Sequence, residues 1–309
     1  MLIGGIEAGG TKMVCALGEV DTMALDGGDA AGAEPVRILE RIQIPTETPE
    51  RTIPCMIDFF AEKGIEALGI GCFGPVDLNL TSQTYGYITK TPKAGWMDCN
   101  IVGAFQKALG VPVGFDTDVN AAALGEVTFG AARNCETAIY ITVGTGVGVG
   151  VYCNGSLLHG LVHPEAGHIL LQRHPKDTYK GRCPFHANCL EGLASGPAVE
   201  ERWGKPGIEL ADREEVWEME AYYIAQAVAN YILAYSPQKI ILGGGIMHQK
   251  QLFPLVQRNV QEMLGGYVNH PLIKENISEY ITAPALGENP GIMGAFELAR
   301  RAFFCQKEW

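Results

Sequence analysis

The chain has 309 residues, of which 47% are hydrophobic and 19% are charged, and this composition excludes an intrinsically disordered protein. Its length is about twice that of a common single domain, so two lobes are expected. The 35 acidic and 23 basic side chains leave a formal charge of -12, which argues against a nucleic-acid or anionic-membrane partner.

Two further features of the sequence bear on its location. The first residues, MLIGGIEAGG, do not resemble a secretory leader, and no apolar run reaches the ~20 residues that span a bilayer. The nine cysteines are an odd number, and most of them stand singly in apolar surroundings, as in proteins of a reducing compartment. We therefore expect a soluble, cytoplasmic protein.

The first part of the chain predicts a meander of strands followed by alternating helices and strands. Strands are expected over 2–6, over the apolar run after the glycine turn AGGTK, and over 37–44 after a polar loop. The pattern continues with a helix, a buried strand, a second helix and another strand, over 49–63, 67–74, 101–109 and 111–115.

The second part of the chain begins the same pattern again, which indicates an internal duplication. The segment 137–158 predicts a strand, a glycine turn and a second strand, and a return strand is expected near 169–171. A long amphipathic helix, a strand with a glycine turn and a closing helix follow, over 214–235, 239–247 and 291–304. This alternation favours mostly parallel sheets covered by helices, in two lobes with a cleft between them.

Three glycine-rich turns follow apolar strands, namely AGGTK, VGTGVG and LGGGIM at 8–12, 143–148 and 242–247. Glycines at a strand end let backbone N–H groups approach an anion, although each turn alone could be an ordinary β-turn. Thr11 and Thr145 add hydroxyl donors, and Lys12 adds a charge suited to phosphate. Because no turn matches GxxxxGKS/T or GxGxxG, the set favours a nucleoside triphosphate held between lobes over a P-loop or Rossmann site.

The segment FDTDVNAAALGE places Asp116 and Asp118 at the end of a strand and directly before an alanine-rich helix. Capping of that helix by Thr117 or Asp118 would explain an acidic residue here. A carboxylate at a strand end beside a cleft could instead act as the general base that takes a proton from a substrate hydroxyl. The two roles are compatible with each other.

His168, Cys183, His186 and Cys189 form a cluster with the spacing of metal ligands. Two thiolates and two imidazoles complete a tetrahedral set for zinc, and the set leaves no open position for a substrate. The sequence therefore predicts a structural zinc ion, and the alternative is a loop with surface histidines and unrelated thiols.

Glu165 and Glu191 lie close in sequence to these ligands. Carboxylates paired with a metal-bound histidine are good acceptors for vicinal hydroxyls, although both residues could also be solvated loop charges. His159, His163 and His174 are expected to be ordinary surface or core residues.

Motifs over nearly the whole chain resemble the ROK family of sugar kinases, in the family's order: GGIEAGGTK, GCFGPVD, DVNAAALGE, ITVGTGVG, HPEAGH, CPFHANCLEGLASGPA and IILGGGIM. The CPFHxxCLEGLASGPA stretch most resembles the bacterial fructokinase branch. The resemblance implies an α/β, actin-like (ribonuclease-H-like) two-lobed fold with a duplicated βββαβα core. We expect lobes over 1–117 and 118–293, with the zinc loop in the larger second lobe and a closing helix over 294–309 on the first.

The resemblance also implies ATP-dependent phosphorylation of a free hexose at its primary hydroxyl, with magnesium accompanying ATP and a structural zinc beside the sugar. D-Fructose is the favoured substrate. A glucokinase or mannokinase of the same family, a sugar-binding regulator without turnover, and an actin-like ATPase that acts on a protein remain alternatives. The absence of a helix-turn-helix before the first strand disfavours a repressor, and a homodimer is compatible with the family.

Site residues follow from the matched motifs. Asp118 matches the catalytic base, and Glu165, His168 and Glu191 match sugar contacts, so that His168 serves metal and sugar together. The ATP-binding residues are matched by the glycine turns and their neighbours: Gly9, Gly10, Thr11, Lys12, Thr142, Gly144, Thr145, Gly146, Pro197, Gly244, Gly245, Ile246, Met247 and His248.

The sequence departs from the family pattern at two places. The usual DxGGTK motif begins here with Glu7, which is one methylene longer than aspartate. The more common CxCGxxGC metal stretch is replaced by CxxHxxC, in which His186 stands where a cysteine is usual. The number of ligands is kept, and a role of Glu7 near magnesium is left open.

Overall fold

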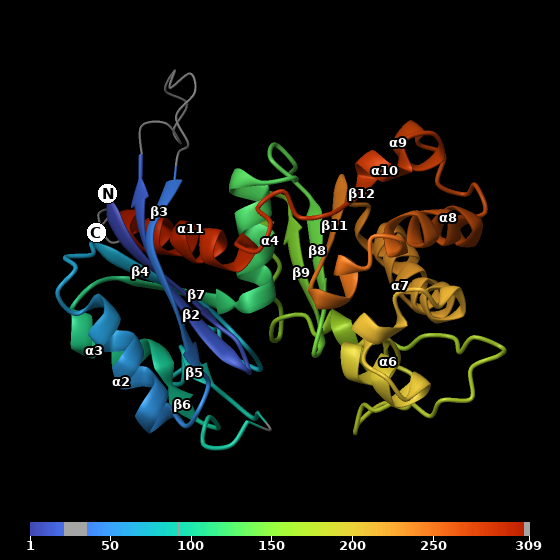
Figure 1. The fold of residues 1–309 in the computed structure, drawn as a ribbon. Helices are drawn as coiled ribbons and strands as arrows, with labels where there is room; N and C mark the ends of the chain where they lie inside the picture. Colours follow the sequence, from blue (N-terminus) through green and yellow to red (C-terminus); the bar gives the residue numbers. More distant parts are fainter. Residues whose placement is uncertain (22–35, 92, 306–309) are drawn as a thin grey trace. The chain divides into compact units, whose positions relative to one another are not determined.

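The structure is a computed structural model that describes residues 1–21, 36–91 and 93–305 (Figure 1). Most of the polar loop expected before the third strand and residues 306–309 of the expected closing helix lie outside this range. The chain divides into two compact units. The first comprises Met1–Gly130, His159–His163 and Leu286–Trp309, and the second comprises Ala131–Leu158 and Pro164–Ala285.

A five-stranded sheet forms the centre of the first unit. β1 (Leu2–Ala8), β2 (Lys12–Val20) and β3 (Val36–Pro45) form an antiparallel meander. β4 (Ala67–Cys72) and β7 (Val113–Thr117) extend it parallel to β1, which gives the order β3-β2-β1-β4-β7. All residues of β4 are buried, as expected for a central strand covered on both faces. β5 (Tyr87–Ile88) and β6 (Cys99–Asn100) form a separate two-stranded ribbon.

Helices cover both faces of this sheet (Figure 1). Alternate residues of β4 point to opposite sides, since Leu68 and Ile70 belong to a different apolar cluster from Ala67. α2 (Pro49–Phe60) and α3 (Ile101–Leu109) pack on the side of Leu68 and Ile70. α4 (Asp118–Phe129) and α11 (Pro290–Cys305) pack on the other.

Glycines allow α11 to approach the sheet and α4 closely. A Cβ atom at Gly69 would lie 1.7 Å from the carbonyl oxygen of Ala295, and one at Gly294 would lie 1.6 Å from that of Ala121. Any larger residue at either position would displace the helix. Because α4 packs against α11 and β4, the first unit continues to Gly130, which differs from the lobe boundary expected after residue 117.

The second unit contains a five-stranded sheet of the same pattern. β8 (Ala138–Val143), β9 (Val147–Cys153) and β10 (Ser156–Leu157) form an antiparallel meander. β11 (Lys239–Gly243) and β12 (Ile281–Thr282) extend it in parallel, which gives the order β10-β9-β8-β11-β12. In both sheets the third strand of the meander is at one edge and the first strand adjoins the parallel pair, so the predicted duplication is confirmed in the topology.

The return strand expected near 169–171 is wrong. Leu170 makes only an isolated bridge with Cys189, and the third strand of the meander is β10. The segment is directed elsewhere because the hydroxyl of Tyr231 donates to the carbonyl oxygen of Ala166 at 2.6 Å, and because Leu171 N donates to the carbonyl oxygen of Asn188 at 2.9 Å. With these bonds, residues 169–171 form an irregular stretch after the short 3-10 turn at 166–168, not a sheet edge.

The remaining elements of the second unit are helical. α7 (Glu214–Tyr235), which the sequence predicted over the same residues, packs against α8 (Leu252–Leu264) and α5 (Leu190–Ala194). The helical elements are η1 (Ala166–His168), α5 (Leu190–Ala194), α6 (Gly196–Trp203), η2 (Gly207–Leu210), α7 (Glu214–Tyr235), η3 (Gly245–His248), α8 (Leu252–Leu264), α9 (Pro271–Lys274) and α10 (Ile277–Tyr280).

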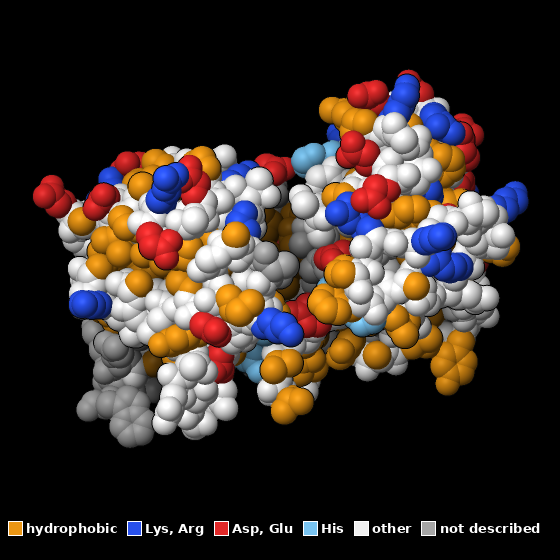
Figure 2. Space-filling model, turned by 90° about the horizontal axis from the view of Figure 1, so that it is seen from below, with side chains coloured by type: hydrophobic (Ala, Val, Ile, Leu, Met, Phe, Trp, Pro, Cys, Tyr) orange, Lys and Arg blue, Asp and Glu red, His pale blue; other side chains and the backbone are white. Residues whose placement is uncertain are grey.

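Among the described residues, none of the helices is both long and apolar enough to cross a bilayer. On the face drawn in Figure 2, acidic and basic side chains lie interspersed among hydrophobic and uncharged ones.

Candidate active site

The candidate base lies at the junction of β7 and α4. Thr117 ends the strand and caps the helix, since its Oγ1 accepts a hydrogen bond from the backbone nitrogen of Asn120 at 3.1 Å. Asp118 is therefore the first residue of the helix, and its Oδ1 accepts from the backbone nitrogen of Val119 at 2.9 Å. Because Thr117 caps the helix, capping does not explain why residue 118 is acidic.

Asp116, two residues earlier, holds this junction together. Its Oδ1 accepts from the backbone nitrogen of Thr117 and from Nδ2 of Asn120, both at 2.7 Å. Its Oδ2 lies 2.8 Å from Nε2 of His159, and the hydrogen bond raises the pKa of that histidine. The sequence predicted His159 to be an ordinary residue, whereas the structure places it against the strand end that carries Asp118.

The first glycine turn joins β1 to β2. The backbone nitrogen of Gly9 donates to the carbonyl oxygen of Lys12 at 3.0 Å, which closes the turn. Thr46, directly after β3, fixes the turn with two hydrogen bonds. Its Oγ1 donates to the carbonyl oxygen of Gly9 at 2.7 Å, and its backbone nitrogen donates to the carbonyl oxygen of Thr11 at 3.0 Å. The exposed residues Gly10, Thr11 and Lys12 are thus held in one shape.

A second lysine, which no sequence motif indicated, reaches the same turn. The ammonium group of Lys93 donates to the carbonyl oxygen of Gly10. The loop of Lys93 is anchored by the buried Trp96, whose indole nitrogen donates to the carbonyl oxygen of Glu47 at 2.7 Å. Two cationic side chains, from Lys12 and Lys93, therefore lie at one glycine turn.

Glu7 lies at the end of β1, beside this turn. Its pKa is raised to about 7, mainly by burial and then by the negative charge of Asp118, while Arg41 and Lys12 act in the opposite direction. Glu7 also fills the space beside α11, because a Cβ atom at Gly291 would lie 2.6 Å from the carboxyl carbon of Glu7. At neutral pH this carboxyl group is therefore partly protonated.

The second and third glycine turns adjoin each other in the second unit. β8 ends at Val143, and its parallel neighbour β11 ends at Gly243. Gly144 and Gly244 therefore directly follow adjacent strand ends. Gly244 has a φ of 88°, and a Cβ atom there would lie 2.5 Å from the carbonyl oxygen of Val143, which only glycine avoids. The backbone nitrogen of Gly196 donates to the carbonyl oxygen of Gly144 at 2.7 Å.

The predicted ATP-binding residues of this unit are consequently gathered around two strand ends and the start of α6. A Cβ atom at Gly196 would lie 3.7 Å from Cδ1 of Ile246 in η3. The residues gathered here are Thr142, Gly144, Thr145, Gly146, Pro197, Gly244, Gly245, Ile246, Met247 and His248. Gly9, Gly10, Thr11 and Lys12 belong to the first unit.

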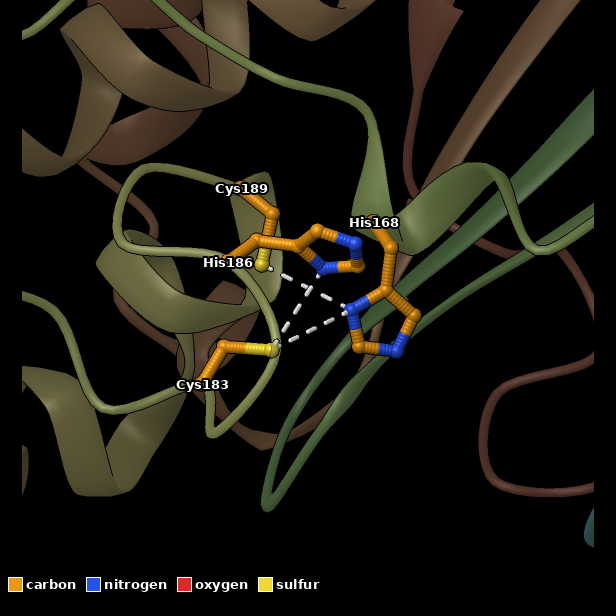
Figure 3. A group of neighbouring side chains, drawn as sticks. All are labelled: His168, Cys183, His186 and Cys189. Atoms are coloured by element: carbon orange, nitrogen blue, oxygen red, sulfur yellow. Dashed lines mark hydrogen bonds between the residues drawn. The ribbon is translucent and has the colours of Figure 1, made fainter.

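The four predicted metal ligands come together in the second unit (Figure 3). The ligand atoms of His168, Cys183, His186 and Cys189 all lie within 4.8 Å of one another. Nδ1 of His168 is 3.8 Å from Sγ of Cys183 and 3.5 Å from Sγ of Cys189. Nδ1 of His186 is 3.6 Å from Sγ of Cys183.

These separations match those around a tetrahedral zinc ion. Bonds of about 2.3 Å to sulfur and about 2.05 Å to nitrogen at a tetrahedral angle put nitrogen and sulfur about 3.6 Å apart. Burial raises the pKa of the Cys189 thiol to about 11, which a dication would counter by favouring the thiolate. The donor set therefore fits zinc.

Glu191 connects the metal cluster with the glycine turn of β8 and β9. Cys189 caps α5 through a hydrogen bond from Gly192 N to its Sγ at 3.3 Å, which places Glu191 in the first turn. Oε2 of Glu191 accepts from the backbone nitrogen of Val147 at 3.0 Å. Its Oε1 lies 3.9 Å from Nε2 of His168.

Glu165 precedes η1 and is joined to the same cluster by the backbone. The nitrogen of His168 donates to the carbonyl oxygen of Glu165 at 2.9 Å. A Cβ atom at Gly167, within η1, would lie 1.9 Å from the carbonyl oxygen of Val147, so η1 packs directly on β9. Glu165, His168 and Glu191 are thus carried by neighbouring elements of one unit.

The chain is similar to known proteins over nearly its whole length. The model of the ROK family matches residues 3–302. The chain belongs to the ROK family. A protein of Bacillus subtilis strain 168, provisionally named a fructokinase, is 50% identical to this ROK chain. The match covers 97% of the chain and 96% of that relative. The fructokinase of Pediococcus pentosaceus is 43% identical, with 98% of the chain and 99% of the relative covered.

Solved structures of ROK proteins share the fold. The ROK hexokinase from Thermus thermophilus has a TM-score of 0.75 and is 26% identical, with 100% of both chains covered. The ROK family glucokinase from Streptomyces griseus, in complex with glucose and AMPPNP, has a TM-score of 0.74 at 25% identity, with 97% of this chain and 100% of that chain covered. The predicted fold class of a ROK sugar kinase is thereby confirmed.

Proposed function

We propose that this ROK chain is an ATP-dependent fructokinase, which transfers the γ-phosphoryl group of MgATP to the primary 6-hydroxyl of D-fructose. The proposal is supported by relatives named fructokinase that are 43% and 41% identical and match 99% and 97% of their own lengths. The observation that carries the chemistry is the carboxylate of Asp118 at the start of a helix whose cap is Thr117.

In this proposal Asp118 is the general base. Its carboxylate takes the proton of the 6-hydroxyl as that oxygen attacks the γ-phosphorus, and the bond from the γ-phosphorus to the bridging oxygen breaks to release ADP. The backbone amides of the Gly9–Lys12 and Gly144–Gly146 turns and the ammonium of Lys12 neutralise charge on the phosphates. Pro197 and the Gly244–His248 turn hold the adenosine.

Glu165, His168 and Glu191 are proposed to bind the sugar hydroxyls. His168 directs Nδ1 to the thiols, so its Nε2 is the atom left for a substrate or for Glu191. A carboxylate accepts hydrogen bonds from two adjacent hydroxyls with little strain, which suits hexose recognition. The hydrogen bond from Val147 N fixes the Glu191 carboxylate in one orientation.

A structural zinc ion is proposed at His168, Cys183, His186 and Cys189. When bound, zinc supplies four bonds that order a loop with few buried side chains. In that loop, Cys183 lies 3.0 Å from the position of a Cβ on Gly192, so the ligands also hold α5 against the loop. The chain's own part is to present two imidazole nitrogens and two sulfurs at zinc-compatible spacing.

Release of ADP across a panel of hexoses tests the proposal. We expect kcat/KM for fructose to exceed that for glucose and mannose, and no ADP release without sugar. Preference for glucose would support the alternative of a glucokinase, which the Streptomyces griseus structure keeps open. Turnover without any sugar would support a protein-directed ATPase, and sugar binding without turnover a regulator. Sedimentation of the same preparation tests for a homodimer.

A further inference from the structure

The segment His159–His163 belongs to the first unit, although the residues on both sides of it belong to the second. Leu161 and Val162 in its middle are 102% and 66% exposed, so burial of apolar side chains does not hold the segment in place. Its two histidines make the contacts instead. They bond to two separate places on the first unit.

The first contact is the hydrogen bond from Nε2 of His159 to Oδ2 of Asp116, at 2.8 Å. The side chain of Asp116 is 3% exposed, whereas that of His159 is 42% exposed. The other oxygen of Asp116 already accepts two hydrogen bonds, from Thr117 N and from Asn120 Nδ2. His159 therefore completes the hydrogen bonding of a buried carboxylate that fixes the start of α4.

The second contact is made by the buried His163. Its Nε2 accepts a hydrogen bond from the backbone nitrogen of Val76 at 3.2 Å. Glu165 follows two residues later, and a chain of two residues spans at most about 7 Å. His163 therefore fixes the second end of the segment within the first unit, two residues before Glu165.

We propose that His159 is a positioning residue for phosphoryl transfer: its bond to Asp116 holds both the strand end that carries Asp118 and the segment that leads to Glu165. This inference rests on the proposed function, because it assigns His159 a part in placing the general base. It gives a role to a histidine that is not among the four residues of the metal cluster.

The pair also sets the charge near the base. The hydrogen bond to Asp116 raises the pKa of His159 and so favours its cationic form, which offsets the negative charge of Asp116, two residues from Asp118. Other titratable groups interact with this strand end: Glu7 on β1 and Cys72 on β4 interact with Asp118, and Tyr85 in a loop interacts with Asp116. Glu7 in turn interacts with three charged groups, namely Lys12, Arg41 and Glu288. Loss of the His159 cation makes Asp118 easier to protonate, so the acid limb of kcat/KM moves to higher pH.

Two substitutions separate the bond from the charge. His159→Gln keeps an N–H donor for Asp116 without a charge, and we expect kcat within about twofold of the parent but an acid limb that lies roughly half a pH unit higher. His159→Leu loses both, and we expect kcat to fall about 10- to 100-fold as well, with KM for ATP unchanged. Leu161→Gln is the matched control, because Leu161 lies on the same segment and its side chain is fully exposed. This variant should leave kcat and the acid limb unchanged.

The proposal is overturned if His159→Leu keeps the parental kcat and acid limb, or if KM for ATP rises as much as KM for fructose. Histidine ring NMR provides a readout that does not need turnover. We expect the titration midpoint of His159, assigned by its loss in His159→Gln, to fall in Asp116→Asn, and an unchanged midpoint would contradict the pairing. A parental protein that phosphorylates no hexose would refute the proposed function while leaving this measurement interpretable.

Discussion

The carboxylate of Glu191 accepts a hydrogen bond from the backbone nitrogen of Val147 at 3.0 Å. Val147 is the first residue after the Gly144–Gly146 turn, and Glu191 follows the metal ligand Cys189 by two residues. A proposed sugar contact is thus bonded directly to a proposed phosphate turn. Any change that loosens α5 is therefore expected to affect sugar and nucleotide binding together.

Loss of the metal is expected to act through this connection. Cys183→Ser removes one thiolate, so we expect substoichiometric zinc, a lower melting temperature and a KM for fructose raised about 10- to 100-fold. Metal analysis, thermal melts and kinetics measure these effects. Cys55→Ser, which changes an exposed thiol outside the cluster, is the control. Full activity in a zinc-free Cys183→Ser protein would show that the cluster does not support the site.

Replacement of the general base is expected to reduce the chemical step. Asp118→Asn keeps the size of the side chain but removes the proton acceptor, so kcat should fall about 10²–10⁴-fold while fructose still binds. Steady-state kinetics and a binding titration with fructose measure the two quantities. Asp58→Asn, an exposed residue of α2, should leave both unchanged. Parental turnover in Asp118→Asn would remove Asp118 from the mechanism.

Lys93 is expected to assist phosphate binding. Its ammonium bonds the Gly10 carbonyl and has three donors, so it can bond a phosphate oxygen at the same turn. Lys93→Met should raise KM for ATP about tenfold and leave KM for fructose near the parental value. Lys107→Met, which removes an exposed charge from α3, controls for the change in net charge. Equal nucleotide affinities in the two variants would argue against a phosphate contact.

Glu220 is expected to lower the stability of the second unit. This residue of α7 is 1% exposed, and neither of its carboxyl oxygens has a hydrogen-bond partner among the described residues. Burial raises its pKa well above the ordinary value. Glu220→Met should therefore increase the free energy of unfolding by about 1–3 kcal/mol, which urea denaturation measures. Glu218→Gln, a change of an exposed neighbour on the same helix, should alter the free energy of unfolding little. A loss of stability in Glu220→Met would contradict the prediction and reveal an unrecognised role of this carboxyl group.

Glu7 gives the stability of the protein a defined pH dependence. The pKa of Glu7 is about 7 in the folded protein and 4.5 ordinarily, so the folded state holds a proton that unfolding releases between these values. The contribution of Glu7 to the free energy of unfolding should be greatest below pH 4.5 and should fall by about 3 kcal/mol as the pH rises to about 7. Glu7→Gln should flatten that slope in chemical denaturation, whereas the exposed Glu62→Gln should not. An identical slope in Glu7→Gln would contradict the burial of this carboxyl.

Regular periodicity explains why most of the fold was predictable. β4 is buried throughout and α7 has an apolar face over its whole length, so each showed a clear pattern in the sequence. α8 was not predicted, although its buried residues recur at helical spacing. The strand expected at 169–171 failed because contacts with Tyr231 and Asn188, far along the chain, decide that segment's path.

The candidate site was predictable where its residues stand in short motifs. The metal ligands lie within one stretch of the chain, and their spacing alone indicated a cluster that the structure brings together. His159 and Lys93 were missed because their partners lie 43 and 83 residues away, and no local pattern marks such pairs. Long-range hydrogen bonds of this kind are visible only after the chain has folded.

The close packing of α11 on β4 and α4, which Gly69 and Gly294 allow, has a consequence for biosynthesis. The helix that covers β1, β4 and β7 is the last one of the described chain, whereas those strands leave the ribosome early. The nascent first unit must wait with a sheet face covered only by α4, while the second unit, encoded in between, has all its strands available. Translation therefore favours completion of the second unit first, and interrupted synthesis before residue 290 would release a chain with an exposed, aggregation-prone β-surface.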